Sequence, residues 1–233
     1  MKKFAPLGLA VAILIAALGV SSPKANAQGA GFISSIINRM ERNRQSLKSL
    51  RAKVDMVKYD SRIKDEDKYT GVVLYVPAVG RNANVRVDWQ SPQRETLSVK
   101  DGQYTLFRPR LNMAYVGRAG QGRSGKQSTA FEFLNMSRQQ LQTRFEPLQY
   151  LGEETLWGGV NTSHIKLVPR GNAGYKYAEV WVDGSGMPVQ TKVVERNDDS
   201  TTVRLTNMEK NAGISLDMFD LKLDFSKVKK VQG

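Results

Sequence analysis

The sequence predicts a mainly β fold with some α-helix: one strongly curved antiparallel sheet of about 11 strands, an N-terminal helix, and short helices over the concave face. Apolar and polar residues alternate along most of the chain, as they do in half-buried strands. Short turns join these alternating segments, and short turns require antiparallel pairing because parallel neighbours need long crossovers. A sheet of this width must curl or split, because wide, flat open sheets are rare.

The chain begins with a predicted secretory signal peptide over residues 1–27. Lys2 and Lys3 provide a positive start, an apolar run covers residues 4–20, and Ala25-Asn26-Ala27 supplies the small residues that a signal peptidase reads. We expect cleavage after Ala27 and export to the periplasm. The alternative is an uncleaved membrane anchor, because the apolar run approaches the length that spans a bilayer.

We expect the mature chain, residues 28–233, to form a single domain. Loss of residues 1–27 removes three lysines and no acid, so the net charge falls from +13 to +10. Cysteine is absent, which excludes disulfides, thiol chemistry and a lipid-modified N-terminal cysteine. The basic residues follow no nucleic-acid-binding motif, so we expect no nucleic acid partner; anionic membrane surfaces or acidic proteins suit an exported basic chain better.

The first half of the mature chain changes from a helical to a strand period. Apolar residues recur near every 3.6 positions over Phe32–Leu50, which predicts a helix. Asp101-Gly102 predicts a two-residue hairpin loop, because both residue types tolerate positive φ, and Ser91-Pro92 predicts another turn. The strands predicted around these turns are Ala52–Ile63, Tyr69–Val76, Asn84–Gln90, Glu95–Lys100, Gln103–Arg108 and Asn112–Gly117.

The second half begins with a polar, glycine-rich loop at residues 118–129. Two short helices are predicted over residues 129–137 and 137–145, and Ser137 with Gln140 has the spacing of a capping box at the start of the second. Residues 214–225 add one further apolar–polar alternation. The strands predicted between these segments are Tyr150–Leu156, Val160–Val168, Tyr177–Asp183, Met187–Glu195 and Thr201–Asn211.

Residues that could support catalysis or metal binding do not converge. His164, the one histidine, alternates with apolar neighbours, so we place it on the polar face of a strand with no serine–acid arrangement around it. Residues 117–126 resemble a phosphate-binding loop, but Gln127 stands where that motif needs Ser or Thr. Asp65-Glu66-Asp67 and Asp198-Asp199 lie at predicted turns and lack calcium-ligand spacing. We therefore expect no enzyme, no catalytic or metal-binding residues and no cofactor.

Residues 85–116, "VRVDWQSPQRETLSVKDGQYTLFRPRLNMAYV", resemble the central signature of the LolA family of periplasmic lipoprotein carriers. In that family an "fRW" strand is followed by a proline turn, a strand ending in Asp-Gly, and an "lWlYdP" strand. Arg86 matches the arginine, Pro92 the turn proline, Asp101-Gly102 the Asp-Gly, and Phe107–Pro109 the end of the next strand. The order of elements extends the resemblance over nearly the whole mature chain.

This resemblance implies an incomplete, half-open antiparallel β-barrel whose mouth is covered by lid helices. It also implies a carrier that shields lipoprotein acyl chains in an apolar cavity and delivers them from the inner to the outer membrane. The implied partners are an inner-membrane ABC-type releasing complex and an outer-membrane acceptor, and we expect a monomer. Two alternatives stay open: a carrier of free phospholipid or another lipid, and an envelope-stress sensor domain that binds an inner-membrane regulator.

Strand alternation assigns residues to the implied cavity, although the same side chains could form an ordinary sealed core. Burying an acyl chain gains about 0.8 kcal/mol per CH₂, so release requires a cavity that is closed or partly collapsed when empty. The resemblance places a possible gate arginine at Arg81. The predicted lipid-cavity residues are Val85, Val87, Trp89, Leu97, Val99, Tyr104, Leu106, Met113 and Tyr115. The predicted lid residues are Phe131, Phe133, Leu134 and Met136.

Overall fold

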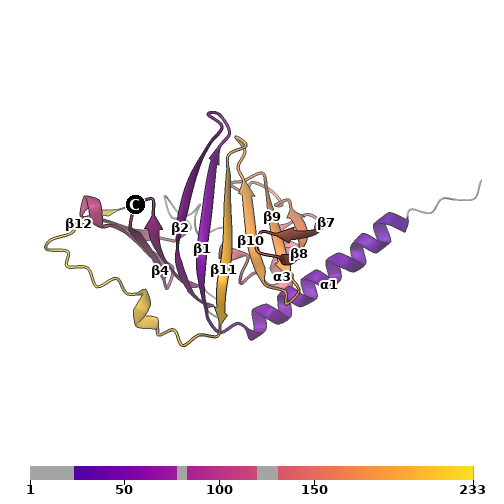
Figure 1. Ribbon diagram of the computed structural model, residues 1–233, viewed down its shortest axis with the longest axis horizontal. Coiled ribbons are helices and arrows are strands. Elements are labelled where there is room, and N and C mark those ends of the chain that lie inside the picture. The colour runs from indigo at the N-terminus through magenta and orange to yellow at the C-terminus, as the bar shows by residue number, and fades with distance from the viewer. Residues whose placement is uncertain (1–23, 78–82, 120–130, 233) are drawn as a thin grey trace, which may run out of the picture.

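The computed structural model describes residues 24–77, 83–119 and 131–232. In these residues, 12 strands form one open, strongly curved sheet with the order β12-β6-β5-β4-β3-β2-β1-β11-β10-β9-β8-β7 (Figure 1). The two edges of the sheet are β12 and β7, which do not pair with each other. The sheet is therefore a half-open barrel.

Two α-helices lie wholly within the described residues and accompany the sheet: α1 (Lys24–Ser46) and α3 (Arg138–Arg144). No helix among the described residues combines the length and the apolar content needed to cross a membrane. The strands of the first half are β1 (Leu50–Asp60), β2 (Asp65–Val76), β3 (Asn84–Ser91), β4 (Glu95–Lys100), β5 (Gln103–Arg108) and β6 (Met113–Arg118), with a 3₁₀ helix, η1 (Pro109–Leu111), between the last two. Those of the second half are β7 (Gln149–Leu156), β8 (Val160–Leu167), β9 (Tyr177–Asp183), β10 (Pro188–Val194), β11 (Ser200–Lys210) and β12 (Lys229–Gln232).

The predicted fold class is confirmed, and local sequence signals explain several boundaries. Asp101 and Gly102 have φ of 49° and 77°, as a two-residue hairpin loop between β4 and β5 requires. Ser137 begins α3 with the expected capping box: its side chain accepts from the Gln140 N–H, and the Gln140 side chain accepts from the Ser137 N–H. The first predicted lid helix falls partly outside the described residues; in its described part, residues 131–132 are helical and residues 133–135 form turns.

The N-terminal helix ends four residues earlier than predicted. Leu47 and Leu50 continue the helical period, yet α1 stops at Ser46 and Leu50 already belongs to β1. The Lys48 N–H donates to Asn211 Oδ1 at 2.7 Å, and the Ser49 hydroxyl donates to a backbone carbonyl in the same segment. These contacts with the residues directly after β11 hold residues 48–49 in an extended conformation. They satisfy polar groups that hydrogen bonds within a longer helix would otherwise satisfy.

The alternation at the C-terminal end has a different basis from that of the strands. Residues 214–225 alternate but form no strand; they include a 3₁₀ helix, η3 (Leu216–Phe219), and cross the outer face of β3 and β4. Arg86 Nη1 donates to the Met218 carbonyl at 2.7 Å and Ser98 donates to the Phe219 carbonyl, so the alternation reflects burial of Phe219 against the sheet. The chain then reaches the far edge, where β12 pairs in parallel with β6 (Figure 1). This pair is the exception to the predicted antiparallel pairing.

Most of the buried apolar side chains belong to two separate clusters. The central cluster consists of Leu47, Leu50, Ala52, Val54, Met56, Val73, Tyr75, Val85, Val87, Trp89, Leu97, Val99, Tyr104, Leu106, Phe131, Leu134, Leu156, Trp181, Met187, Val189, Val203 and Leu205. The helix cluster consists of Ile36, Ile37, Met40, Phe133, Met136, Leu141, Phe145, Ile165, Leu167, Ala178, Val180, Val182 and Val193. The helix cluster thus joins α1 and α3 to strands β8–β10.

A close backbone approach fixes α1 on the second half of the sheet. Gly186, in the turn between β9 and β10, has a φ of +88°, and a Cβ atom there would overlap the Arg39 carbonyl group of α1. Only glycine tolerates both that backbone conformation and that close approach. A Cβ atom at Gly184, in the same turn, would have nothing within 4 Å of it, so the constraint is specific to Gly186.

Candidate functional site

The inner face of the first half of the sheet is built from rows of residues that pair directly across strands. Partners in antiparallel strands point to the same face. One row runs Tyr75–Val85–Val99–Tyr104, and the next runs Val73–Val87–Leu97–Leu106–Tyr115. A third row runs Trp89–Glu95–Arg108–Met113. All nine predicted cavity residues therefore lie on one face, as the alternation predicts.

Burial divides these nine residues into two groups. Seven of them are buried in the central cluster, with exposed fractions of 8% or less. Tyr115 is half-buried and packs against the cluster, whereas Met113 is half-buried and lies beyond it, beside Arg108 and Glu95 in the third row. Met113 is thus at the polar end of the inner face.

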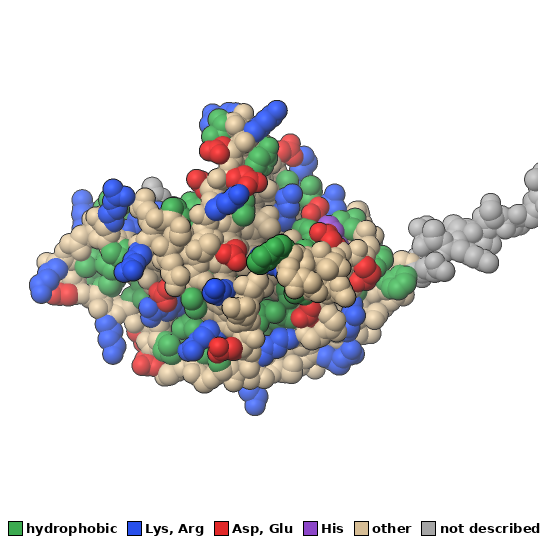
Figure 2. Space-filling model, in the orientation of Figure 1, with side chains coloured by type: hydrophobic (Ala, Val, Ile, Leu, Met, Phe, Trp, Pro, Cys, Tyr) green, Lys and Arg blue, Asp and Glu red, His purple; other side chains and the backbone are tan. Residues whose placement is uncertain are grey.

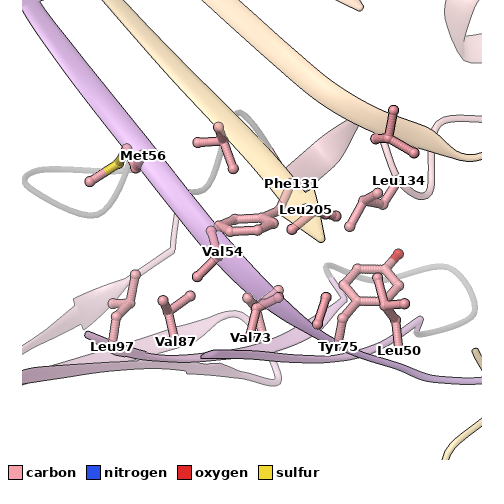
Figure 3. Packing of buried hydrophobic residues seen from close by; sticks show 14 of the residues in the cluster. Leu50, Val54, Met56, Val73, Tyr75, Val87, Leu97, Phe131, Leu134 and Leu205 are labelled. Atoms are coloured by element: carbon pink, nitrogen blue, oxygen red, sulfur yellow. The ribbon is translucent and has the colours of Figure 1, made fainter. Parts of the chain in front are cut away.

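Sequence reasoning missed the contribution of the neighbouring strands to the same face. Leu50, Ala52, Val54 and Met56 alternate along β1, and Val203 and Leu205 along β11, and all are buried in the central cluster. Figure 3 shows residues from β1, β2, β3, β4 and β11 converging on one interior. The alternation that led to the predicted cavity residues of β3–β6 is equally clear in β1, so the same signal could have placed the β1 residues on this face.

The four predicted lid residues divide between the two clusters. Phe131 and Leu134 are buried in the central cluster, and Phe133 and Met136 are buried in the helix cluster. Figure 3 shows Phe131 reaching into the middle of the central cluster, near Val54 and Leu205. The segment 131–136 therefore covers the central cluster with one side and is anchored among the helices by the other.

Three polar atoms in the central cluster are buried without a hydrogen-bond partner among the described residues: Tyr75 Oη, Tyr104 Oη and Trp89 Nε1. An unpaired buried polar group costs about 1–3 kcal/mol, so a sealed core rarely retains several. Burial raises the pKa of Tyr75 well above its ordinary value, which keeps the phenol neutral and able to donate. The interior therefore offers hydrogen-bond donors within a largely apolar lining.

A carboxylate joins the start of α3 to α1. Glu41 of α1 accepts hydrogen bonds from Arg44, with Nη2 and Oε1 2.6 Å apart, and from the backbone N–H of Arg138 at the start of α3, at 3.1 Å. Hydrogen bonding by Arg44, reinforced by the Arg138 N–H and Gln45, lowers the pKa of Glu41 from 4.5 to about 2. This contact fixes the N-terminus of α3, directly after the lid segment.

The remaining sequence candidates do not form a second site. His164 lies in β8, stacked on Trp181 with ring centroids 4.0 Å apart, and its ring nitrogens are 3.3 and 3.5 Å from Glu154 and Glu179. Asp198 pairs with Lys176 at 2.6 Å. In the described part of the chain, no group of three His, Cys, Asp or Glu side chains has the arrangement of a metal site.

Two predicted features lie outside the described residues: the possible gate Arg81 and most of the glycine-rich loop at 118–129. The acidic run at residues 65–67 begins β2 and is exposed. Basic side chains are scattered among acidic ones over the face in Figure 2 and form no single patch there.

Comparison with known proteins identifies the relatives of this fold. Residues 78–222 match the family described as "outer membrane lipoprotein carrier protein LolA". No significant match was found among curated proteins.

Two solved structures with TM-scores above 0.5 show the same fold at low identity, and a third match has a lower score. A conserved protein from Thermus thermophilus is 12% identical, with a TM-score of 0.53 over 87% of this chain and 99% of that one. MucB is 14% identical, with a TM-score of 0.54 over 85% of this chain and 65% of that one. A MucA/MucB complex from Pseudomonas aeruginosa is 14% identical, with a TM-score of 0.46 over 85% of this chain and 62% of that one.

Proposed function

This chain belongs to the LolA family, and on that premise we propose that it is a periplasmic carrier that holds acyl chains against the inner face of its sheet. The favoured cargo is a lipoprotein, taken from an inner-membrane ABC-type releasing complex and delivered to an outer-membrane acceptor. The carrier performs no covalent chemistry. The observation that carries the proposal is the central cluster, which combines an apolar lining, unpaired hydrogen-bond donors and a separate covering segment.

The closed interior suits a carrier that must release its cargo. Transfer of a ~16-carbon chain from water to an apolar interior gains roughly 12 kcal/mol, which alone would make release too slow. Here the inner-face side chains contact one another, and Phe131 lies in their midst. Cargo must displace Phe131 and spread the cluster, and that work offsets part of the gain.

The unpaired donors suit the polar part of a lipid anchor. An acyl chain attached through an ester or amide carries a carbonyl oxygen next to its first methylene. Tyr75 and Tyr104 stand in one row, three strands apart, with their hydroxyls buried and unpaired among the described residues. Donation to such carbonyls would remove the cost of burying these hydroxyls when cargo is bound.

The experiment that tests the proposal is native mass spectrometry, with lipid extraction, of protein isolated directly from the periplasm. Co-purifying triacylated lipoprotein supports the proposed cargo, and free phospholipid changes the cargo but retains the carrier. Protein that carries no lipid and binds no added acyl probe contradicts the proposal.

A further inference from the structure

A pocket of about 530 Å³ lies at the polar end of the inner face, next to the central cluster. Its floor is aromatic: Tyr69 and Trp89 meet edge to face with ring centroids 5.8 Å apart. Trp89 belongs to the central cluster and Tyr69 packs against it. Two aromatic rings thus border both this pocket and the apolar interior.

The pocket marks the point where the inner-face rows change from apolar to charged. In β1 the buried residues Val54 and Met56 are followed, two positions on, by Lys58. In β5 the buried residues Tyr104 and Leu106 are followed in the same way by Arg108. The inner face is therefore amphipathic along the strand direction, with its basic end at one rim.

Basic groups outnumber acidic ones around this pocket. The charged lining consists of Lys58, Arg94, Arg108 and Arg110 on the basic side and Glu95 on the acidic side. Arg108 Nε lies 2.9 Å from Glu95 Oε1, so the carboxylate of Glu95 neutralises the charge of Arg108. Arg94 and Arg110 are exposed and form no ion pair with any described residue. An anion entering the pocket would meet two guanidinium groups that no carboxylate of the described chain neutralises.

One further group points to a ligand. Trp89 is 4% exposed, lines the pocket, and its Nε1–H has no hydrogen-bond partner among the described residues. Guanidinium groups recognise phosphate oxygens through paired N–H donors, and an indole N–H can add another. The basic side chains would hold a charged head group, while the adjoining rows accept apolar chains.

We propose that this pocket binds the phosphate of an anionic phospholipid whose acyl chains lie along the apolar rows of the inner face. The proposal rests on the proposed function, because it assigns the acyl chains to the same interior. It adds a head-group site that would let the same interior also hold a phospholipid, because a phospholipid carries a phosphate, whereas the amide- and ester-linked anchor of a lipoprotein does not.

The test compares two short-chain probes with the same acyl chains, dihexanoyl phosphatidylglycerol and dihexanoylglycerol, by isothermal titration calorimetry on the full mature chain. We expect the phosphatidylglycerol to bind at least about tenfold more tightly, and the difference to shrink as salt is raised. The double variant Arg94→Gln/Arg110→Gln should lose that difference while its affinity for dihexanoylglycerol stays unchanged.

The matched control is Arg42→Gln/Arg62→Gln. It removes the same two charges from exposed positions outside the pocket, so it should keep the tenfold preference. Both double variants alter exposed side chains and should unfold at the temperature of the parent protein, which circular dichroism can confirm.

Each other outcome overturns the head-group site in a distinguishable way. Equal binding of both probes, unaffected by the arginine changes, removes the site but leaves the carrier. Loss of both probes in the pocket variant shows that the arginines only shape the interior. If inorganic phosphate binds without any lipid and competes with phosphatidylglycerol for the pocket, the pocket is a site for free phosphate. Binding of neither probe to the parent protein contradicts the carrier as well.

Discussion

The two buried clusters of this protein are similar in chemistry but differ in how they are closed. The helix cluster is apolar, is covered by α1 and α3, and contains none of the unpaired buried polar atoms found in the described chain. The central cluster contains three of them, and the side chains that cover it come from the short segment with Phe131 and Leu134. The helix cluster has the features of a structural core, and the central cluster has the features that the proposed carrier requires of its binding interior.

This difference teaches that burial alone does not identify a binding site in a half-open barrel. Phe131 and Phe133 are 4% and 2% exposed, so burial does not separate them. The two rings differ in their surroundings. Phe133 packs on Phe145 of the helix cluster, at a centroid distance of 6.2 Å, whereas Phe131 is buried in the central cluster, which also contains the three polar atoms without a partner among the described residues. The predictions that follow exploit such matched pairs.

The largest expected effect separates these two phenylalanines. Phe133→Ala leaves a cavity in a well-packed core and should lower the free energy of unfolding by about 3–5 kcal/mol. Phe131→Ala should cost about 2 kcal/mol, because the lid segment can shift into the space, and should raise the affinity for a fatty-acyl probe several-fold. Urea unfolding measures the two changes in stability, and titration with the fatty-acyl probe measures the change in affinity. Equal losses of stability with unchanged binding would make the two clusters equivalent.

The next effect tests the attachment of α1 to the sheet. Gly186→Ala places a Cβ against the Arg39 carbonyl in a backbone conformation that favours glycine, and should cost about 2–4 kcal/mol. Gly184→Ala, two residues away in the same turn, is the control and should change stability by less than about 0.5 kcal/mol. Thermal unfolding of the two variants provides the comparison. A small effect at Gly186 would show that α1 is not held closely.

A smaller effect concerns the unpaired hydroxyls of the central cluster. Tyr75→Phe and Tyr104→Phe remove buried oxygens that have no partner among the described residues, so each variant should be about 1 kcal/mol more stable than the parent protein. Each should also bind an acyl ester several-fold more weakly. If both changes destabilise the empty protein, the hydroxyls have partners in it and the comparison between clusters fails.

The smallest effect is a pH dependence at the join between α1 and α3. The pKa of Glu41 is about 2 in the folded protein and 4.5 ordinarily, so its stabilising effect is complete above the ordinary value and is lost as pH falls towards 2. After allowance for solvent screening, the loss should be about 1 kcal/mol. The difference in unfolding free energy between the parent protein and Glu41→Gln should shrink over that range. If the difference in unfolding free energy stays constant over that pH range, the Glu41 carboxylate does not stabilise the join between α1 and α3.

The sequence predicted much of the sheet because strand alternation and turn chemistry are local. The bounds of β4, β5 and β9 agree with the prediction, and the Asp101-Gly102 loop and the Ser137 capping box have the expected geometry. The inner-face positions of β3–β6 followed from parity alone. These features depend on neighbouring residues, and tertiary contacts reinforce rather than override them.

The missed features depend on contacts between distant segments. β12 contains one apolar residue, Val231, and exists because its backbone pairs with β6. The division of the lid segment between two clusters depends on where α1 lies, which no periodicity of residues 131–136 reveals. The basic pocket likewise joins residues from β1, β5 and two connecting turns. Sequence parity could place each residue on a face but could not show which groups meet.

The central claim, that acyl chains bind among the central-cluster side chains, has a direct test in photolabelling with a diazirine-bearing fatty-acyl probe. A second apolar groove, of about 1030 Å³ between α1, α3 and the start of β7, provides the competing location and includes Phe32 and Leu148. Peptide mapping by mass spectrometry should find the label on inner-face residues of β3–β5, such as Val87 and Leu97. Label confined to Phe32, Leu148 and their neighbours would place the ligand in the groove and contradict the account.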